Sequence, residues 1–343
     1  CHRSQFWDTH DRIKNFFTNH QMFGFTWTPI FAKNHNNKRT TADLFDKQLH
    51  SYVITDAIKD ENVLKFSIEY INTFKKKEDF EKLADEKVED INTKEIFESQ
   101  ERIDKVTDYI INIHNTKTQS KYFTWMFCVS NVDTLIKYYD SFKSKNHNLK
   151  IATIFSYWVN EEDKDADGLT DDIKLDIGEN EVNKHSRDKL EEYIGDYNKT
   201  FWVKYTTKDS KEFYNYYNDI AKKVKERKID ILLVVNMFLT WFDSKTLNTL
   251  YVDKNLKYHW LIQAFSRTNR ILNEQKSQGN IVCFRNLKKD VDEAVALFSN
   301  KNAKETILIE SLEKYIEYFN DWLKKLRSIA QGPQSVDDIS SEQ

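Results

Sequence analysis

An uninterrupted apolar run at residues 231–235 constrains the fold of this chain more than any other feature. A strand that is buried on both faces reads as a continuous apolar run, whereas a half-exposed strand alternates apolar and polar residues. Strands buried in this way belong to parallel sheets whose two faces are covered by helices. The run therefore predicts one strand of a parallel sheet, and a second short run at residues 250–252 predicts another.

Strand-like and helix-like segments alternate through residues 120–290. This alternation predicts an α/β fold built on a parallel, doubly wound sheet. The expected set of five strands lies at residues 123–129, 149–156, 229–235, 249–252 and 280–284, and expected helices lie at 132–143, 183–194 and 209–227.

The regions on either side of this block have different patterns. A short apolar, strand-like segment lies at residues 22–25, and the polar stretch that follows includes a strand-like segment at 63–68 and a helical one at 94–115. After residue 290 the pattern is helical only and ends in a polar tail from Gly332. We therefore expect four regions, which span residues 1–34, 35–119, 120–290 and 291–343.

Composition excludes several classes of protein. Charged residues make up 31% of the chain and the mean hydropathy is −0.73, with no run suited to crossing a membrane, so no membrane partner is expected. Cys1, Cys128 and Cys283 are scattered, which suits a reducing cytoplasm, and we expect a cytoplasmic location. The nine histidines are also dispersed, so no metal site is expected within the chain.

Charge is distributed unevenly although the net charge is only −3. Residues 254–289 hold eight Lys and Arg against one acid, Glu274, and this basic segment could face phosphates or be a solvated surface. Residues 161–181 are acidic and include Asp163, Asp165 and Asp167, the opening of a calcium-loop pattern. Such a loop needs a carboxylate at its twelfth position, where Lys174 stands, so a solvated acidic loop is favoured.

A polar stripe is expected on the helix that follows residues 250–252. Gln263, Arg267 and Arg270 are spaced i, i+4 and i+7, which places them on one helical face. Only 10 of the 52 basic residues are arginine, so two arginines in one stripe suggest bidentate phosphate contact rather than surface decoration. Residues on the opposite, buried face are Tyr258, Leu261, Ile262 and Phe265.

Hydroxyl-bearing residues follow several of the expected strands. Thr26 and Thr28 precede Pro29, where simple turn chemistry would explain them. Ser130 follows the strand at 123–129, where capping of the next helix is the usual role of a serine. Thr240 and Asp243 lie in the turn after the apolar run at 231–235.

These segments resemble the motifs of superfamily 2 helicases. Residues 1–5 resemble the end of a D-E-x-H motif, 25–29 the T-G-T-P motif, 126–131 motif IV, 239–243 motif V, and 263–270 the Q-x-x-x-R-x-x-R of motif VI. Three stretches of the sequence are similar to the restriction (R, motor) subunit of type I restriction-modification enzymes. They are TWFDSKTLNTLYVDKNLKYH, LIQAFSRTNRI and NIVCFRNL. The likeness extends over most of residues 1–300.

The resemblance implies an ATP-driven translocase of double-stranded DNA with two RecA-like lobes. Residues 1–34 would end the first lobe, 120–290 would form the second, and the helices after 291 would open a helical domain. Arg270 would be the arginine finger on the γ-phosphate, and Arg267 and Gln263 would bind phosphate and support the attacking water. The further roles implied are nucleotide binding by His2, Arg3 and Asp243, coupling of hydrolysis to movement by Thr26 and Thr28, and DNA-backbone contact by Ser130 and Thr240.

The chain also departs from the family pattern. It has no phosphate-binding G-K-[ST] loop, the two magnesium-associated acids would precede Cys1, and the family's upstream nuclease domain is not in the chain. ATP and Mg²⁺ are therefore expected to bind through an upstream lobe, and this C-terminal fragment alone is expected to be inactive. Modification and specificity subunits are the partners implied. The alternatives are another superfamily 2 DNA helicase, for repair or remodelling, and a catalytically dead DNA-binding module.

Glycine is scarce and tryptophan abundant, with six and eight residues respectively. Five tryptophans stand where the family pattern has or accepts glycine, including the T-G-T-P and motif V turns. One cause would explain them all: the codon UGA, read here as tryptophan, in a lineage that decodes it as glycine. The alternative is a decayed protein with accidental tryptophans. The five are Trp7, Trp27, Trp202, Trp241 and Trp260, and Trp125, Trp158 and Trp322 could be the same.

Overall fold

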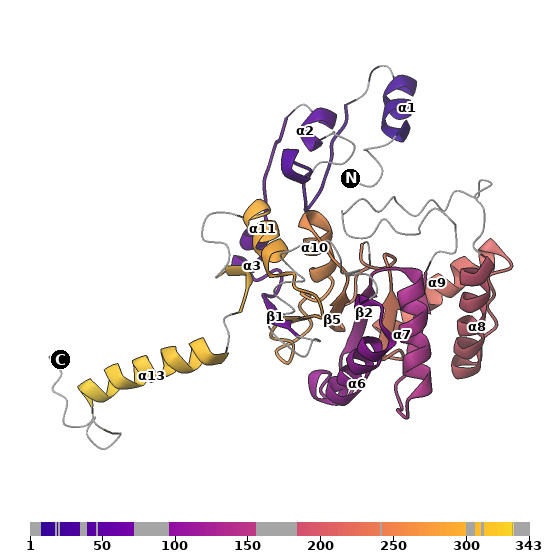
Figure 1. Cartoon of the computed structure of the whole chain (residues 1–343). Coiled ribbons are helices and arrows are strands. Elements are labelled where there is room, and N and C mark those ends of the chain that lie inside the picture. The colour runs from indigo at the N-terminus through magenta and orange to yellow at the C-terminus, as the bar shows by residue number, and fades with distance from the viewer. Residues whose placement is uncertain are drawn as a thin grey trace.

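Six parallel strands form one sheet (Figure 1). The structure is a computed structural model that describes residues 8–17, 19, 21–34, 40–45, 47–71, 96–155, 184–240, 242–299, 306–309, 312–330 and 332. The strand order is β1-β6-β5-β2-β4-β3, and every neighbouring pair is parallel. The predicted α/β fold with a parallel sheet is therefore confirmed.

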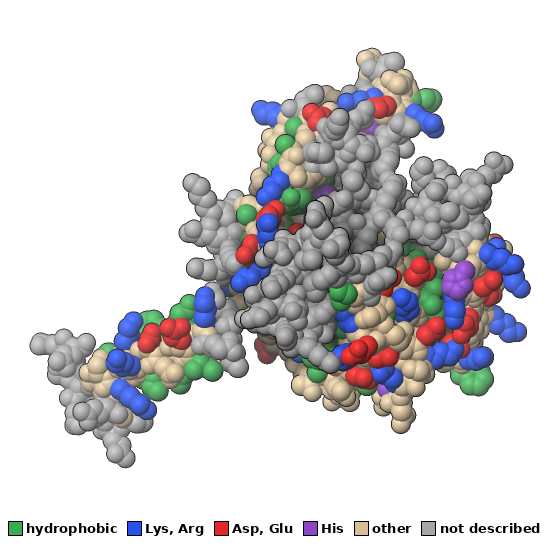
Figure 2. Space-filling model, viewed as in Figure 1, with side chains coloured by type: hydrophobic (Ala, Val, Ile, Leu, Met, Phe, Trp, Pro, Cys, Tyr) green, Lys and Arg blue, Asp and Glu red, His purple; other side chains and the backbone are tan. Residues whose placement is uncertain are grey.

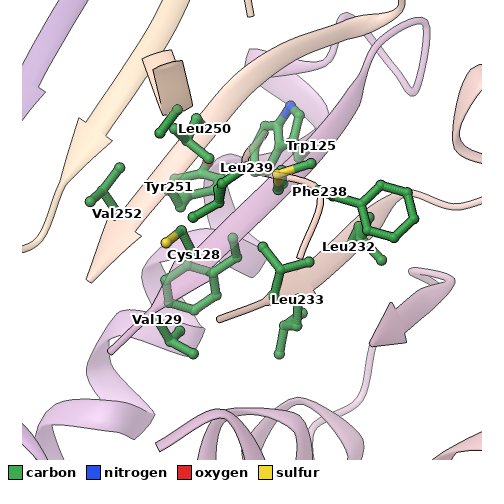
Figure 3. Close-up of a cluster of buried hydrophobic side chains, with 14 of the residues drawn as sticks. Trp125, Cys128, Val129, Leu232, Leu233, Phe238, Leu239, Leu250, Tyr251 and Val252 are labelled. Atoms are coloured by element: carbon green, nitrogen blue, oxygen red, sulfur yellow. The ribbon is translucent and has the colours of Figure 1, made fainter. Parts of the chain in front are cut away.

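The middle of the sheet is fully buried, as the apolar runs predict. Every residue of β2 (Thr124–Val129), β4 (Ile231–Val234) and β5 (Leu247–Asp253) is buried. Side chains from these strands and from the loop after β4 pack together in the core (Figure 3). Helices on both faces of the sheet account for the continuous apolar sequence of these strands.

The sheet has one strand more than the five expected. β1 (Phe66–Tyr70) pairs with β6 (Gly279–Cys283) at one edge, so residues from the polar stretch 35–119 join the sheet of the central block. As an edge strand, β1 is only partly buried after Phe66 and lacks the continuous apolar run of the inner strands. At the other edge, β3 (Ile151–Ile154) pairs with β4 and is shorter than the pattern at 149–156 predicts.

Helices connect the strands at the places expected. α6 (Gln100–Lys117) packs on α7 (Val132–Ser144), and α7 lies against β2 and β4. The cap of α7 is Asn131, whose side chain accepts from the Thr134 amide at 2.8 Å. The capping role expected of Ser130 is therefore wrong, because the adjacent asparagine occupies the N-cap position. The next two helices are α8 (Lys184–Phe201) and α9 (Ser210–Lys225).

A buried charge network holds the carboxyl end of β5. The carboxylate of Asp253 accepts from both terminal nitrogens of Arg102 at 2.8 Å, from Arg285 at 3.0 Å and from Tyr138 at 2.7 Å. Burial would raise the pKa of Asp253, but the two arginines outweigh it and hold this pKa well below its usual range. The network joins α6, α7, β5 and the end of β6, and so fixes these elements relative to one another.

The N-terminal segment contains α1 (Asp8–Phe16), the short turn η1 (Ala32–Asn34), α2 (Thr41–Leu44) and α3 (Ile54–Lys59). α1 and α2 lie apart from the sheet (Figure 1), whereas Ala57 and Ile58 of α3 belong to the main buried core. Residues 22–25 are not a strand, contrary to the sequence pattern, and Phe23 and Phe25 are exposed. A strand needs a neighbouring strand to bond it, and among the described residues no strand pairs with this segment.

The C-terminal region is helical, as predicted, but contains two separate helices. α11 (Lys288–Leu297) packs on α10 (Tyr258–Phe265), whereas α13 (Leu312–Ile329) extends away from the sheet (Figure 1). Apolar side chains on α13 lie exposed on the surface (Figure 2). They include Tyr315, Ile316, Phe319, Trp322, Leu326 and Ile329.

Candidate functional site

The helix that carries the predicted polar stripe is shorter than the pattern indicates. α10 ends at Phe265, where the backbone N–H and the hydroxyl of Thr268 both donate to the Phe265 carbonyl, at 3.0 and 2.8 Å. The prediction of one helical stripe is therefore wrong, because Arg267 and Arg270 lie in the turn beyond the helix. The buried face is confirmed for Leu261, Ile262 and Phe265, and Tyr258 is partly buried.

Arg267 folds back and ties this turn to the loop after β4. Its Nε donates to the Gln263 carbonyl at 3.0 Å, and a terminal nitrogen donates to the Phe242 carbonyl. Burial, and then the positive charge of Arg270, lower the pKa of Arg267 to about 10. The guanidinium remains charged at neutral pH and holds the Gln263 backbone and residues 242–243 near each other.

Arg270 is more accessible and pairs with a carboxylate. Its Nε lies 2.8 Å from Asp243 Oδ1, and the two side chains are 30% and 63% exposed respectively. The guanidinium carbon of Arg270 also lies 5.8 Å from the centre of the Trp27 ring. The indole at this motif position is 70% exposed and lies beside Arg270 without displacing it from Asp243.

The predicted coupling threonines meet the same site. Gln263 Nε2 donates to Thr28 Oγ1 at 2.7 Å, and the backbone N–H of Thr28 is 3.2 Å from Thr26 Oγ1. Thr28 is almost fully buried, so this contact is shielded from water. Residues from the N-terminal segment, the loop after β4 and the turn after α10 are thus brought together.

A buried lysine that sequence reasoning missed lies close to these residues. Lys276 is 2% exposed, and its Nζ donates to the carbonyls of Lys245 and Leu247, both at 2.8 Å. Burial, and then the charge of Arg270, lower the pKa of Lys276 to about 7, although Asp243 opposes the shift. In a chain this rich in lysine, no sequence signal distinguishes Lys276 from the solvated lysines around it.

Ser130 directly follows β2, and Thr240 lies in the loop after β4. Both side chains are buried, and Lys254 connects their two loops by donating to the Ser130 carbonyl at 3.2 Å and to Asn236 Oδ1 at 2.7 Å. The Thr240 hydroxyl has no hydrogen-bond partner among the described residues. Lys254 and Asn236 were not predicted, and only the position of each just after a strand could have indicated them.

Several predictions fall outside the described residues. These are His2 and Arg3, the acidic segment at 161–181, and Trp7, Trp158 and Trp241. Within the described part of the chain, no group of three or more His, Cys, Asp or Glu is placed to hold a metal ion. In that same part, every helix is too short or too polar to cross a membrane.

The six-stranded parallel sheet with its connecting helices has the architecture of a RecA-like helicase lobe. A family model for type I restriction enzyme subunit R domain 3 matches residues 121–286, and one for SWI2/SNF2 ATPases matches residues 1–102. A type I restriction enzyme endonuclease subunit of Staphylococcus aureus (strain COL) is 48% identical over all of this chain and 36% of its own length. One from Staphylococcus saprophyticus is 46% identical over the same shares.

The chain belongs to the family of type I restriction enzyme R subunits. It spans about a third (36%) of the length of these curated relatives. Among solved structures, a fragment of an HsdR subunit of a type I restriction enzyme from Vibrio vulnificus YJ016 covers 77% of this chain and 39% of its own, with 11% identity and a TM-score of 0.41.

Proposed function

We propose that this chain forms part of an ATP-driven motor that moves double-stranded DNA through a type I restriction enzyme. The observation that carries the proposal is the contact between Gln263 and Thr28, with Arg270 beside it. It joins the N-terminal segment to the sheet at a point where a partly exposed guanidinium is available for phosphate. Hydrolysis sites between two lobes need such a contact to convert a change at the phosphate into movement.

Arg270 is the proposed arginine finger, which stabilises negative charge on the γ-phosphate in the transition state. Its partner Asp243 orients the guanidinium through Nε and leaves the terminal nitrogens for phosphate. Arg267 holds the turn in place and adds positive charge beside the phosphates. Gln263 supports the attacking water, and its bond to Thr28 transmits the state of the site to the N-terminal segment.

Mg²⁺ and most of the ATP contacts are proposed to come from an upstream lobe, with His2 and Arg3 at its nucleotide-binding end. Residues 1–343 alone are therefore expected not to hydrolyse ATP. DNA-stimulated ATPase activity of the isolated chain would contradict this expectation.

DNA is proposed to lie along the loops after β2 and β4. Ser130 and Thr240 would contact the sugar-phosphate backbone, which suits a motor that steps along any sequence. Lys254 keeps these loops together, and the unpartnered hydroxyl of Thr240 has capacity for one acceptor. In the assembled enzyme, the modification and specificity subunits would choose the DNA site, and the location would be cytoplasmic.

The test is ATP-dependent displacement of a third DNA strand by the full-length subunit assembled with modification and specificity subunits. A motor displaces triplexes at times that increase with their distance from the recognition site. Displacement that is absent, or independent of ATP, would contradict translocation. A repair or remodelling helicase would act without the modification and specificity subunits, and a dead DNA-binding module would bind DNA without hydrolysing ATP.

We further propose that some of the tryptophans are glycine in the native protein. Trp202 supports this, because it is 93% exposed and its φ of 56° lies in the left-handed region that favours glycine. Trp27 is also exposed and stands at a motif turn. Trp125 gives no such support, because it is fully buried and its ring centre lies 4.5 Å from that of His114 and 4.7 Å from that of Tyr251. Figure 3 shows Trp125 and Tyr251 in the core. Mass spectrometry of peptides from the native protein tests this proposal, because a peptide with glycine in place of tryptophan is measurably lighter.

A further inference from the structure

A second buried contact joins the N-terminal segment to α10. Asn34 Nδ2 lies 3.2 Å from His259 Nδ1, although the two residues are 225 positions apart. Both are nearly excluded from solvent, at 5% and 6% exposure. A polar contact in such a place costs free energy unless both groups are satisfied, so its geometry carries information.

The hydrogen bonds around Asn34 fix the direction of this contact. Asn34 Oδ1 accepts from the Phe31 backbone N–H at 2.7 Å, so the Nδ2 side of the amide faces His259. An amide nitrogen only donates, and therefore His259 Nδ1 accepts and its ring carries its proton on Nε2. The contact is a directional bond between two neutral groups, and Asn34 Nδ2 also donates to the Pro29 carbonyl at 3.4 Å.

Other contacts seat the same turn on α10 and α11. Lys33 lies 3.2 Å from Glu293 and 5.7 Å from the Tyr258 ring centre, and Phe31 lies 6.1 Å from the ring centre of Phe298. The ion pair is partly exposed, with side chains at 53% and 33%, so it contributes little free energy. The buried Asn34–His259 bond is therefore expected to contribute more than this ion pair to the position of η1 on α10.

His259 and Gln263 are one helical turn apart, so both project from the same face of α10. Their partners Asn34 and Thr28 are six residues apart in the N-terminal segment. Two bonds thus connect the same pair of segments, one at the proposed hydrolysis site and one beyond it. A single bond would allow the segments to rotate about it, whereas two bonds fix the rotation.

We propose that Asn34 and His259 are positioning residues that hold α10 in register with the N-terminal segment, so that Gln263 meets Thr28 and Arg270 faces the phosphates. This inference rests on the proposed motor function. Neither side chain is among those proposed to touch ATP or DNA. Their loss is therefore expected to lower kcat for DNA-stimulated ATP hydrolysis and leave KM for ATP within about twofold of its original value.

The test is a double-mutant cycle in the full-length subunit, assembled with modification and specificity subunits on DNA. Asn34→Ala and His259→Ala should each lower kcat about tenfold, because each removes the buried bond that holds α10 against the N-terminal segment. The double variant should be no slower than the slower single variant, because both remove the same bond. His259→Gln supplies an acceptor oxygen and should recover part of kcat, whereas His259→Leu should not.

Lys33→Ala is the matched control, since it removes the exposed contact of the same turn, and its kcat should stay within about twofold of wild type. Additive losses in the double variant, a rise in KM for ATP with kcat intact, or equal kcat for the Gln and Leu variants would overturn the proposal while the motor function stands. If the alanine variants lose their folded state, seen as a lost melting transition, the kcat values of His259→Gln and His259→Leu are compared instead, at lower temperature. A wild-type assembly without DNA-stimulated ATPase activity would instead overturn the motor function and this inference with it.

Discussion

Arg270 Nε lies 2.8 Å from Asp243 Oδ1, which joins the turn after α10 to the loop after β4. Both side chains are partly exposed, so the pair is worth little to the stability of the fold. The pair instead fixes the orientation of the Arg270 guanidinium, because Asp243 holds one of its nitrogens and the remaining ones keep a fixed direction. A group that must meet a developing charge works best when its direction is set beforehand.

Asp243→Ala should therefore affect activity and not stability. We expect kcat for DNA-stimulated ATP hydrolysis in the full-length subunit to fall about 10- to 30-fold, because the guanidinium of Arg270 loses its orientation but keeps its charge. The melting temperature should change by less than about 2 °C. Steady-state kinetics and thermal melts check the two parts. A large loss of stability with unchanged kcat would show that the pair is structural.

Asp253→Asn, in contrast, is expected to affect stability and not activity. It leaves two buried arginines, Arg102 and Arg285, without their shared carboxylate, and breaking a buried pair costs about 3–5 kcal/mol. Urea denaturation should show this loss of unfolding free energy. Asp196→Asn is the control, because its pair with Lys143 lies on the surface and should contribute about 1 kcal/mol or less. Equal effects of the two substitutions would contradict the importance of the network.

Lys276 predicts an unusual dependence of stability on pH. Its pKa is about 7 in the folded protein and about 10.4 in an unfolded chain, so between these values the unfolded state binds more protons. Stability then rises with pH in that window. The neutral amine still has two hydrogens for the carbonyls of Lys245 and Leu247.

The measurement is the difference in unfolding free energy between wild type and Lys276→Met. That difference should move in favour of wild type by roughly 3.5 kcal/mol as pH rises from 7 to 10. Titratable groups that the two proteins share contribute equally to both unfolding free energies and therefore cancel in the difference. A difference that stays constant or moves in favour of Lys276→Met would show that the lysine is protonated in the folded state throughout.

Trp202→Gly should stabilise the protein. The backbone at this position is left-handed, which costs a residue with a Cβ about 1 kcal/mol that glycine does not pay. Trp202→Ala is the matched control, since it removes the same exposed indole and keeps the Cβ. Glycine should exceed alanine by about 1 kcal/mol in unfolding free energy. If alanine equals or exceeds glycine, the left-handed conformation carries no strain.

The sequence predicted the inner strands well, because burial on both faces leaves a continuous apolar run in β2 and β4. It underestimated β1, whose partly polar residues are those of an edge strand. The end of α10 was also missed, since helical spacing continues through Arg267 and Arg270 while the Thr268 hydroxyl closes the helix at Phe265. Spacing alone cannot reveal a local hydrogen bond that competes with the helix.

Within the candidate site, only the residues that belong to a sequence motif could be predicted. Gln263, Arg270, Asp243 and Thr28 were all named from the sequence and meet in the structure. Buried polar residues without a motif, such as Lys276 and Asn34, could not be predicted, because only the tertiary contacts that bury them distinguish them from solvated residues of the same type. Domain boundaries stay predictions.

The most direct test of the motor function is the ATPase activity of Arg270→Ala in the full-length subunit, assembled with its partner subunits on DNA. We predict that kcat falls about a thousandfold or more, as expected for an arginine finger, while KM for ATP changes little. A variant that hydrolyses ATP within about twofold of the wild-type rate would contradict the role of Arg270, and with it the assignment of this site to ATP hydrolysis.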